Sequence, residues 1–188
     1  AYIDMPLQHI SSPVLQSMCR ATNREKTMAL LHKLKAALPE AVFRTTLIVG
    51  FPTETEAAFE ELKDFVKEFR FDRLGVFTYS EEEGTPAAAM EDVVPAEEKE
   101  RRADEIMRLQ EDISLSLNEA RVGKLFEVVI DREEGDYYIG RTRYDSPEVD
   151  DEVLIERADG KLQIGGFYEV RITEAEIHDL YGRVVGAC

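Results

Sequence analysis

The chain is poor in cysteine and histidine and lacks long apolar segments. Its 188 residues include two cysteines, Cys19 and Cys188, three histidines and no tryptophan. Two thiols exclude a disulfide framework and any cluster that needs three thiolates from this chain alone, and their scarcity fits a reducing cytoplasm. No apolar run reaches the roughly 18 residues of a membrane span, and the first residues lack the layout of a signal peptide. We therefore expect a soluble, cytoplasmic protein of one or two domains that does not associate with membranes.

Basic residues are also few. The sequence has 23 Lys and Arg against 39 Asp and Glu, which gives a formal net charge of −16. Bulk nucleic-acid binding is disfavoured, because neutralisation of phosphates is the main term in that affinity. The acidity is shared along the chain, since residues 121–188 alone hold 16 acidic and nine basic side chains. This charge either keeps the protein soluble or attracts a basic protein partner.

Residues 1–120 alternate strand and helix patterns. Strands are predicted at 2–5, 41–49 and 73–79, and helices at 23–38, from 53 to 69 and at 95–121. The continuous apolar end of segment 41–49 is typical of a parallel strand that helices cover on both faces. Thr53 and Glu56 have the spacing of a capping box at the start of the second helix. Right-handed crossovers between such strands predict a parallel α/β sheet or part of an α/β barrel.

Residues 121–188 change to short strands separated by glycine-containing turns. The predicted strands are 125–131, 137–144, 152–157, 166–173 and 182–185. Five short strands in about 65 residues indicate a small antiparallel barrel of the OB type. The predicted domain boundary is near residue 121.

Polar residues follow the predicted parallel strands at the edge where α/β folds bind ligands. Gly50 either gives a strand-to-helix turn its backbone freedom or exposes backbone groups to an adenine-like ring. Gln8 either contacts a ribose or substrate, or closes a loop with a hydrogen bond. Arg44 shares a strand face with Thr46 and Ile48 by alternation, and it needs a partner, which is either a ligand carboxylate or a protein acid such as Asp4.

Three other features favour a structural interpretation. His9 is a lone loop histidine, so a structural role is favoured over acid–base chemistry. Cys19 is predicted to be a small packing residue on the side of a helix. Residues 81–83 are three consecutive glutamates, which form either a solvated loop or a contact with a cationic substrate.

Four sequence blocks resemble the radical S-adenosylmethionine methylthiotransferases. They are residues 4–11 (DMPLQHIS), 44–56 (RTTLIVGFPTETE), 77–85 (FTYSEEEGT) and 107–114 (MRLQEDIS), and the last 65 residues are similar to the TRAM domain that ends those enzymes. Within the family, residues 6–11 and 140–150 are most similar to the branch that methylthiolates an aspartate of the twelfth small-subunit ribosomal protein. Thr53 stands where the family usually has glycine, so this turn must use ordinary backbone angles.

The resemblance implies the C-terminal part of a radical S-adenosylmethionine α/β barrel over residues 1–120 and a TRAM domain over residues 121–188. The family's cluster-binding domain and its Cys-x3-Cys-x2-Cys segment would precede Tyr2. The full-length enzyme would use S-adenosylmethionine and two 4Fe-4S clusters, none of them held by these residues. This chain alone is therefore expected to be inactive and to bind S-adenosylmethionine weakly at most.

The resemblance also assigns site residues. Ile48 and the Gly50 turn would line the adenosyl group of S-adenosylmethionine, with Gln8 and Arg44 as polar contacts and Tyr79 with Ser80 as a wall. The barrel loop 145–152 holds five acids beside Pro147. We expect its Glu148, Asp150 and Asp151 to dock the basic ribosomal protein, unless the loop is only a solvated turn.

Two other functions stay open. One is methylthiolation of an adenosine in transfer RNA, the activity of a close relative in the same superfamily. The acidity of residues 121–188 argues against it, because an RNA-binding domain should gain affinity from lysines and arginines. The other is a non-catalytic acidic binding module.

Overall fold

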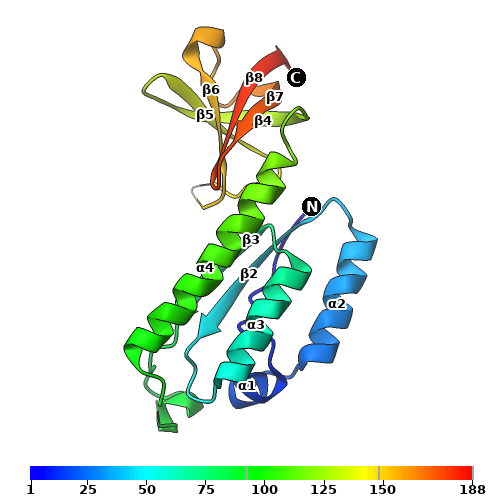
Figure 1. Ribbon diagram of the computed structural model, residues 1–188. Coiled ribbons are helices and arrows are strands. Elements are labelled where there is room, and N and C mark those ends of the chain that lie inside the picture. Colours follow the sequence, from blue (N-terminus) through cyan, green and yellow to red (C-terminus); the bar gives the residue numbers. More distant parts are fainter. Residues whose placement is uncertain (92, 148, 188) are drawn as a thin grey trace. The chain divides into compact units, whose positions relative to one another are not determined.

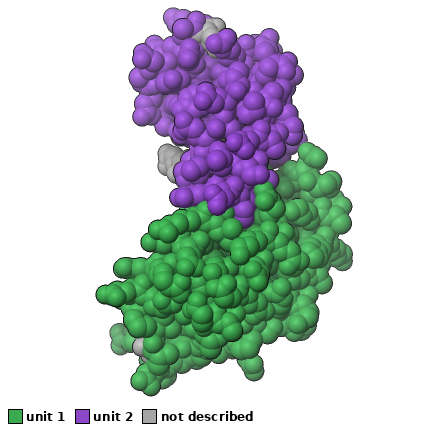
Figure 2. Space-filling model, in the orientation of Figure 1, with its two compact units in different colours: residues 1–110 green, residues 111–188 purple. Residues whose placement is uncertain are grey.

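The computed structural model describes residues 1–91, 93–147 and 149–187 and divides into two compact units. The units are residues 1–110 and 111–188, coloured separately in Figure 2. The division falls inside helix α4 (Ala96–Glu119). The domain boundary near residue 121 stays a prediction.

The first unit is built on a three-stranded parallel sheet (Figure 1). Its strands β1 (Tyr2–Asp4), β2 (Val42–Val49) and β3 (Arg73–Thr78) lie in sequence order, with β2 in the centre. Helix α2 (Arg24–Ala37) connects the first two strands and helix α3 (Glu56–Phe69) the last two. The prediction of parallel strands joined by helical crossovers is confirmed.

Helix α3 supplies much of the core of this unit. Its predicted inward residues, Phe59, Leu62, Val66 and Phe69, are all buried. The predicted cap was wrong. Thr55, not Thr53, caps the helix, and its hydroxyl accepts a hydrogen bond from the Ala58 amide at 3.2 Å. Thr53 is not among the described residues with positive φ. This agrees with the expectation that a β-branched residue in this turn uses ordinary backbone angles.

The two faces of β2 differ in burial, which corrects the expectation that helices cover both. Thr45, Leu47 and Val49 are completely buried on one face. Arg44, Thr46 and Ile48 alternate with them and are only half-buried. One face of the central strand is therefore open to a ligand.

The sequence patterns did not predict three short helices. They are α1 (Ser12–Ser17), η1 (Pro86–Ala89) and η2 (Arg157–Asp159). Segments of three to six residues are too short to show helical periodicity. Among the described residues, no helix is both long and apolar enough to cross a bilayer.

The second unit contains a closed five-stranded barrel with the order β4-β5-β6-β8-β7. The strands are β4 (Leu125–Glu134), β5 (Tyr137–Thr142), β6 (Glu152–Glu156), β7 (Phe167–Ala175) and β8 (Asp179–Ala187). The five predicted strands are confirmed, although the last is longer than expected. The barrel is not wholly antiparallel, because β6 and β8 pair in parallel to close it.

Inward side chains fill the barrel. They are mostly β-branched residues that alternate with exposed positions along the strands, and they include Val128, Ile130, Val153, Ile155, Val170 and Ile172. Gly182 lies opposite Ile172 in the β7–β8 pair, and a Cβ there would overlap Val170. The narrow interior is thus a packed core.

Candidate functional site

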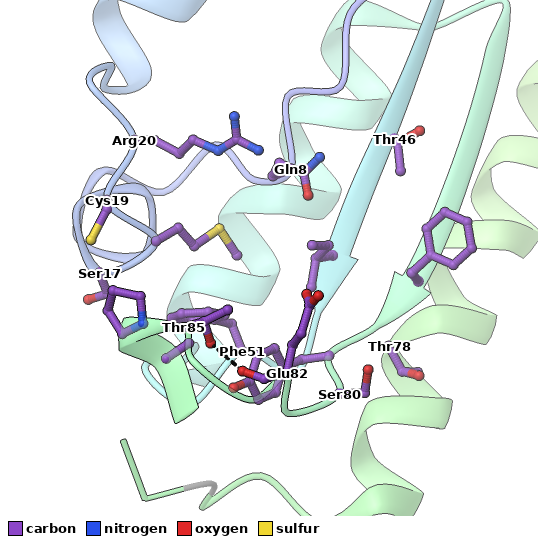
Figure 3. A pocket seen from close by; sticks show the side chains of 16 residues that line it. Gln8, Ser17, Cys19, Arg20, Thr46, Phe51, Thr78, Ser80, Glu82 and Thr85 are labelled. Atoms are coloured by element: carbon purple, nitrogen blue, oxygen red, sulfur yellow. Dashed lines mark hydrogen bonds between the residues drawn. The ribbon is translucent and has the colours of Figure 1, made fainter. Parts of the chain in front are cut away.

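A cavity of about 690 Å³ lies within the first unit (Figure 3). Its walls come from four segments: the loop after β1, the end of α1, the open face of β2 with the turn after it, and the end of β3 with the following segment up to η1. The lining residues are Gln8, Ser17, Met18, Cys19, Arg20, Thr46, Ile48, Phe51, Phe77, Thr78, Tyr79, Ser80, Glu82, Thr85, Pro86 and Ala87. Apolar walls with a few polar groups at this volume are typical of small-molecule sites.

Strand β2 and the segment after it supply an apolar wall. Ile48 lies on the half-buried face of the strand, and Phe51 follows the strand's end. The rings of Phe51 and Tyr79 meet edge to face, with centroids 5.1 Å apart. This edge-to-face contact fixes the orientation of the two rings at the cavity wall.

Gln8 is fixed at the cavity by its backbone. Its amide donates to the Thr46 carbonyl at 2.9 Å, and its carbonyl accepts from the Ile48 amide at 2.7 Å. These bonds extend the sheet by one bridge, although Gln8 has a φ of 70°. A non-glycine residue in this region is uncommon, and such residues cluster at functional sites. The backbone thus closes the loop while the side chain lines the cavity (Figure 3).

The end of α1 forms another wall. The chain turns at Cys19, which has a φ of 58°, and the Arg20 amide donates to the Leu15 carbonyl at 2.9 Å. The packing role predicted for Cys19 was wrong, because its side chain is exposed and lines the cavity. Sequence alone could not reveal this, because α1 is too short to be predicted.

A buried charged cluster ties together three segments around the cavity. The His9 Nε2 atom lies 2.8 Å from Glu54 Oε2, and both side chains are fully buried. His9 Nδ1 accepts the Ser11 amide at 3.0 Å, so the ring proton resides on Nε2 and is donated to Glu54. This confirms a structural role for His9.

The other carboxylate oxygen of Glu54 accepts two further hydrogen bonds. The Gly50 amide donates to Oε1 at 2.8 Å, and Arg102 Nη1 on α4 donates at 2.6 Å. Burial alone would raise the pKa of Glu54, but the hydrogen bonds from His9, Gly50 and Arg102 hold it below the ordinary value of 4.5. Glu54 thus joins the loop after β1, the turn after β2 and helix α4.

Sequence reasoning did not single out Glu54 or Arg102. A signal for Arg102 was present, because Lys99, Arg102 and Ile106 recur at helical spacing and are all buried. Charged residues on the buried stripe of a helix indicate buried partners.

The structure brings together four of the six residues assigned to the S-adenosylmethionine site. Gln8, Ile48, Tyr79 and Ser80 line one cavity. Their contact with S-adenosylmethionine stays a prediction.

Gly50 and Arg44 are not among the residues that line this cavity. Gly50 has a φ of 73°, and a Cβ there would overlap the Lys99 side chain. Its amide donates a hydrogen bond to Glu54. Gly50 therefore has an evident structural role in the tight turn after β2. Arg44 is the register partner of Asp4 in the β1–β2 pair.

The residues present fit S-adenosylmethionine but not an iron–sulfur cluster. The cavity has the volume, apolar walls and polar groups that a nucleoside requires. The full sequence has two cysteines, short of the three thiolates that a 4Fe-4S cluster with one open iron needs. Within the described ranges, no group of three His, Cys, Asp or Glu side chains could hold a metal ion.

The acidic barrel loop is engaged with its own unit. Asp151 is buried and accepts a hydrogen bond from Asn118 Nδ2 at 2.8 Å, and its contact with a partner stays a prediction. Asp150 is half-buried and accepts from the Ser146 amide at 2.8 Å. Glu148 lies outside the described residues. Docking of the ribosomal protein by this loop stays a prediction.

Comparison with known proteins identifies the relatives of the chain. The family model of the TRAM domain matches residues 122–185. A ribosomal protein uS12 methylthiotransferase RimO from Christiangramia forsetii is 56% identical over 181 residues, which are 96% of this chain and 40% of that protein. The protein of the same name from Phocaeicola vulgatus is 52% identical over 185 residues, which are 98% of this chain and 43% of that protein.

The chain thus spans about two fifths of the length of the curated relatives it matches. The likeness extends over nearly all of the residues and includes the four blocks noted in the sequence. The predicted resemblance is confirmed, because nearly the whole chain is similar to part of these RimO proteins and residues 122–185 match the TRAM domain.

Proposed function

We propose that this chain is the C-terminal portion of a methylthiotransferase that modifies an aspartate of ribosomal protein uS12. The observation that carries this proposal is the 56% identity to a uS12 methylthiotransferase over 96% of the chain. Residues 1–110 would complete a radical S-adenosylmethionine barrel with strands that the matching part does not include. The cytoplasm is the proposed location, because ribosomal proteins are made there.

The 690 Å³ cavity is proposed to hold S-adenosylmethionine. Ile48, Phe51 and Tyr79 would enclose the adenine, while Gln8 and Ser80 would offer hydrogen bonds to the ribose. When bound, S-adenosylmethionine would supply the radical chemistry and the methyl group. The chain's own contribution would be to orient the nucleoside and to exclude water from it.

The uneven burial of β2 supports a place in a larger barrel. In an α/β barrel, one strand face meets the outer helices and the other faces the interior. Thr45 and Leu47 match the first environment, and Thr46 and Ile48 match the second. The iron–sulfur clusters would be held outside these residues, so we expect no turnover by residues 1–188 alone.

The proposed substrate can be tested with a longer version of the protein that includes the upstream cysteine segment. It would be assayed against purified ribosomal protein uS12 and against transfer RNA, with mass spectrometry of both products. Addition of one methylthio group to an aspartate of uS12 is the expected result. Activity only on transfer RNA would support the RNA-modifying alternative, and a native gene without upstream cysteines would favour a non-catalytic binding module.

Ligand binding can be tested on residues 1–188 themselves. Calorimetric titration with S-adenosylmethionine should show weak binding that weakens further when Ile48 is replaced by Asp. The matched control is Val185→Asp at an exposed position of the barrel. Equal binding by both variants would contradict the proposed cavity.

A further inference from the structure

The outer face of the barrel carries a groove of about 320 Å³. Residues of β5, β6, β7 and β8 line it, and Figure 1 labels these strands. Val153, Ile155 and Leu180 belong to the packed core of the barrel. Leu154 and Tyr181 alternate with them along β6 and β8 and therefore point outward. The groove is thus separate from the core and is accessible to a partner.

Two tyrosines and a leucine form the apolar part of the groove. Leu154 is the register partner of Tyr181 in the β6–β8 pair. The rings of Tyr137 and Tyr181 meet edge to face, with centroids 6.1 Å apart. All three side chains are half-buried, so part of their surface stays accessible. Such a surface suits a long cationic side chain, because aromatic faces attract the charge and the apolar atoms contact the methylene stem.

Carboxylates flank the two rings. Glu156 is the register partner of Tyr137, and Glu174 is that of Tyr181. Both glutamates are exposed, and neither forms an ion pair within the part of the chain that the structure describes. Of the described residues that line the groove, Arg183 alone is basic. Two carboxylates at the groove are therefore accessible to a cation from a partner.

Negative charge also acts on the groove from nearby residues. The pKa of the Tyr181 hydroxyl is raised, first by burial and then by the negative charges of Glu176, Asp179 and Glu174. The second effect means that the hydroxyl lies in a negative electrostatic potential. Such a potential attracts a cation and repels a phosphate.

We propose that this groove binds an arginine side chain of a basic protein partner. The planar guanidinium stacks on aromatic rings and forms paired hydrogen bonds with a carboxylate, which a lysine cannot reproduce. A nucleotide base also stacks on tyrosine, but its phosphate would be repelled by Glu156 and Glu174. The inference deepens the proposed function, on which it rests for the identity of the partner. Ribosomal protein uS12 would supply the arginine.

The first arm of the test uses two small probes that differ in charge. N-acetyl-arginine amide and N-acetyl-citrulline amide would be titrated into residues 1–188, with NMR detection at the rings of Tyr137 and Tyr181. Citrulline replaces the guanidinium with a neutral urea group of similar shape. We expect the arginine probe to bind about tenfold more tightly, the effect of one charge-assisted hydrogen bond. N-acetyl-lysine amide should have an intermediate affinity, because it keeps the charge and loses the planar fork.

A pair of double variants tests the carboxylates. Glu156→Gln combined with Glu174→Gln should remove the preference for arginine over citrulline. The matched control is Glu127→Gln combined with Glu169→Gln, which changes the net charge equally. These two glutamates are exposed register partners in the β4–β7 pair and do not line the groove. Tyr137→Leu should weaken arginine binding, because it removes one ring and keeps an apolar side chain.

The second arm tests the class of partner. Binding of purified uS12 and of a single-stranded RNA oligonucleotide to residues 1–188 would be measured with the same variants. The groove variant should bind uS12 more weakly than the control variant, and the RNA should not shift the tyrosine resonances. If the arginine probe binds and uS12 does not, the arginine site is supported, and the result contradicts the proposed uS12 substrate.

Three results would overturn the arginine site itself. The first is equal binding, or no binding, of the arginine and citrulline probes. The second is loss of the preference in the control variant as complete as in the groove variant, because the effect would then be one of net charge. The third is a shift of the tyrosine resonances by RNA and not by the arginine probe, because the groove would then be a nucleic-acid site.

Discussion

His9 and Glu54 are 45 positions apart in the sequence, yet their side chains meet at 2.8 Å with no exposed surface. Glu54 also accepts the Gly50 amide and Arg102. One carboxylate thus holds the residue next to Gln8 and the residue next to Phe51, both of which line the cavity. The shape of the cavity depends on this buried cluster.

Replacing Glu54 with Gln should destabilise the first unit. The neutral amide cannot accept from both His9 and Arg102 as well as the carboxylate does, and His9 cannot switch tautomer while Nδ1 accepts from Ser11. Breaking a buried charged pair costs about 3 kcal/mol. Urea denaturation of the variant should show this loss, whereas Glu100→Gln, at an exposed position of α4, should change the free energy of unfolding little.

The same carboxylate predicts a specific dependence on acid. The pKa of Glu54 is below 4.5 in the folded chain, so its stabilisation is present above the unfolded value and is lost as the pH falls through the folded pKa. The stability difference between the native chain and Glu54→Gln should therefore shrink below pH 4.5. Denaturation measured from pH 7 to pH 3 tests this, and a constant difference would contradict the assigned protonation state.

Replacing Gly50 with Ala should cost more than the backbone strain alone. Gly50 and Gly84 both have positive φ, at 73° and 82°, and an L-residue there costs about 1–2 kcal/mol. A Cβ at Gly50 would also overlap Lys99, whereas the space around Gly84 is open. Thermal unfolding should show a larger loss for Gly50→Ala than for Gly84→Ala. Equal losses would mean that Lys99 moves aside without cost.

Gly182→Ala should destabilise the barrel. Its Cβ would overlap Val170 in the packed interior, and overpacking of a core costs about 1–3 kcal/mol. Gly186→Ala on the same strand meets open space and provides the control. Hydrogen exchange of the amides in β7 and β8 measures the effect, and similar protection in both variants would contradict a tightly packed barrel.

Asp151→Asn should affect stability and not partner binding. Asp151 is buried against Asn118, and a hydrogen bond to a charged group contributes about 1.5–3 kcal/mol. Denaturation should detect a loss that Glu127→Gln, at an exposed position of β4, does not cause. If Asp151→Asn instead left stability unchanged and weakened the salt dependence of uS12 association, the docking prediction for this loop would be supported.

The elements with long, regular patterns could be predicted from the sequence. The apolar stripe of α3 and the alternation in the barrel strands repeat with the period of the helix or strand itself, so a short stretch of sequence reveals them. The parallel direction of the strands could also be predicted from the sequence, because helical crossovers connect parallel strands. The short helix α1 could not be predicted, and with it the positions of Cys19 and Arg20 at the cavity were missed.

The sequence by itself determined the resemblance to known proteins, the order of the longer elements and four cavity residues, because these depend on local pattern and on blocks of identity. Only the tertiary structure decided which charges are buried and which are available. Glu54 and Asp151 are both acids in polar segments, and their partners Arg102 and Asn118 are 48 and 33 positions away. Such distant contacts cannot be read from the local sequence. They form in the folded chain because burying a charge without a partner costs free energy.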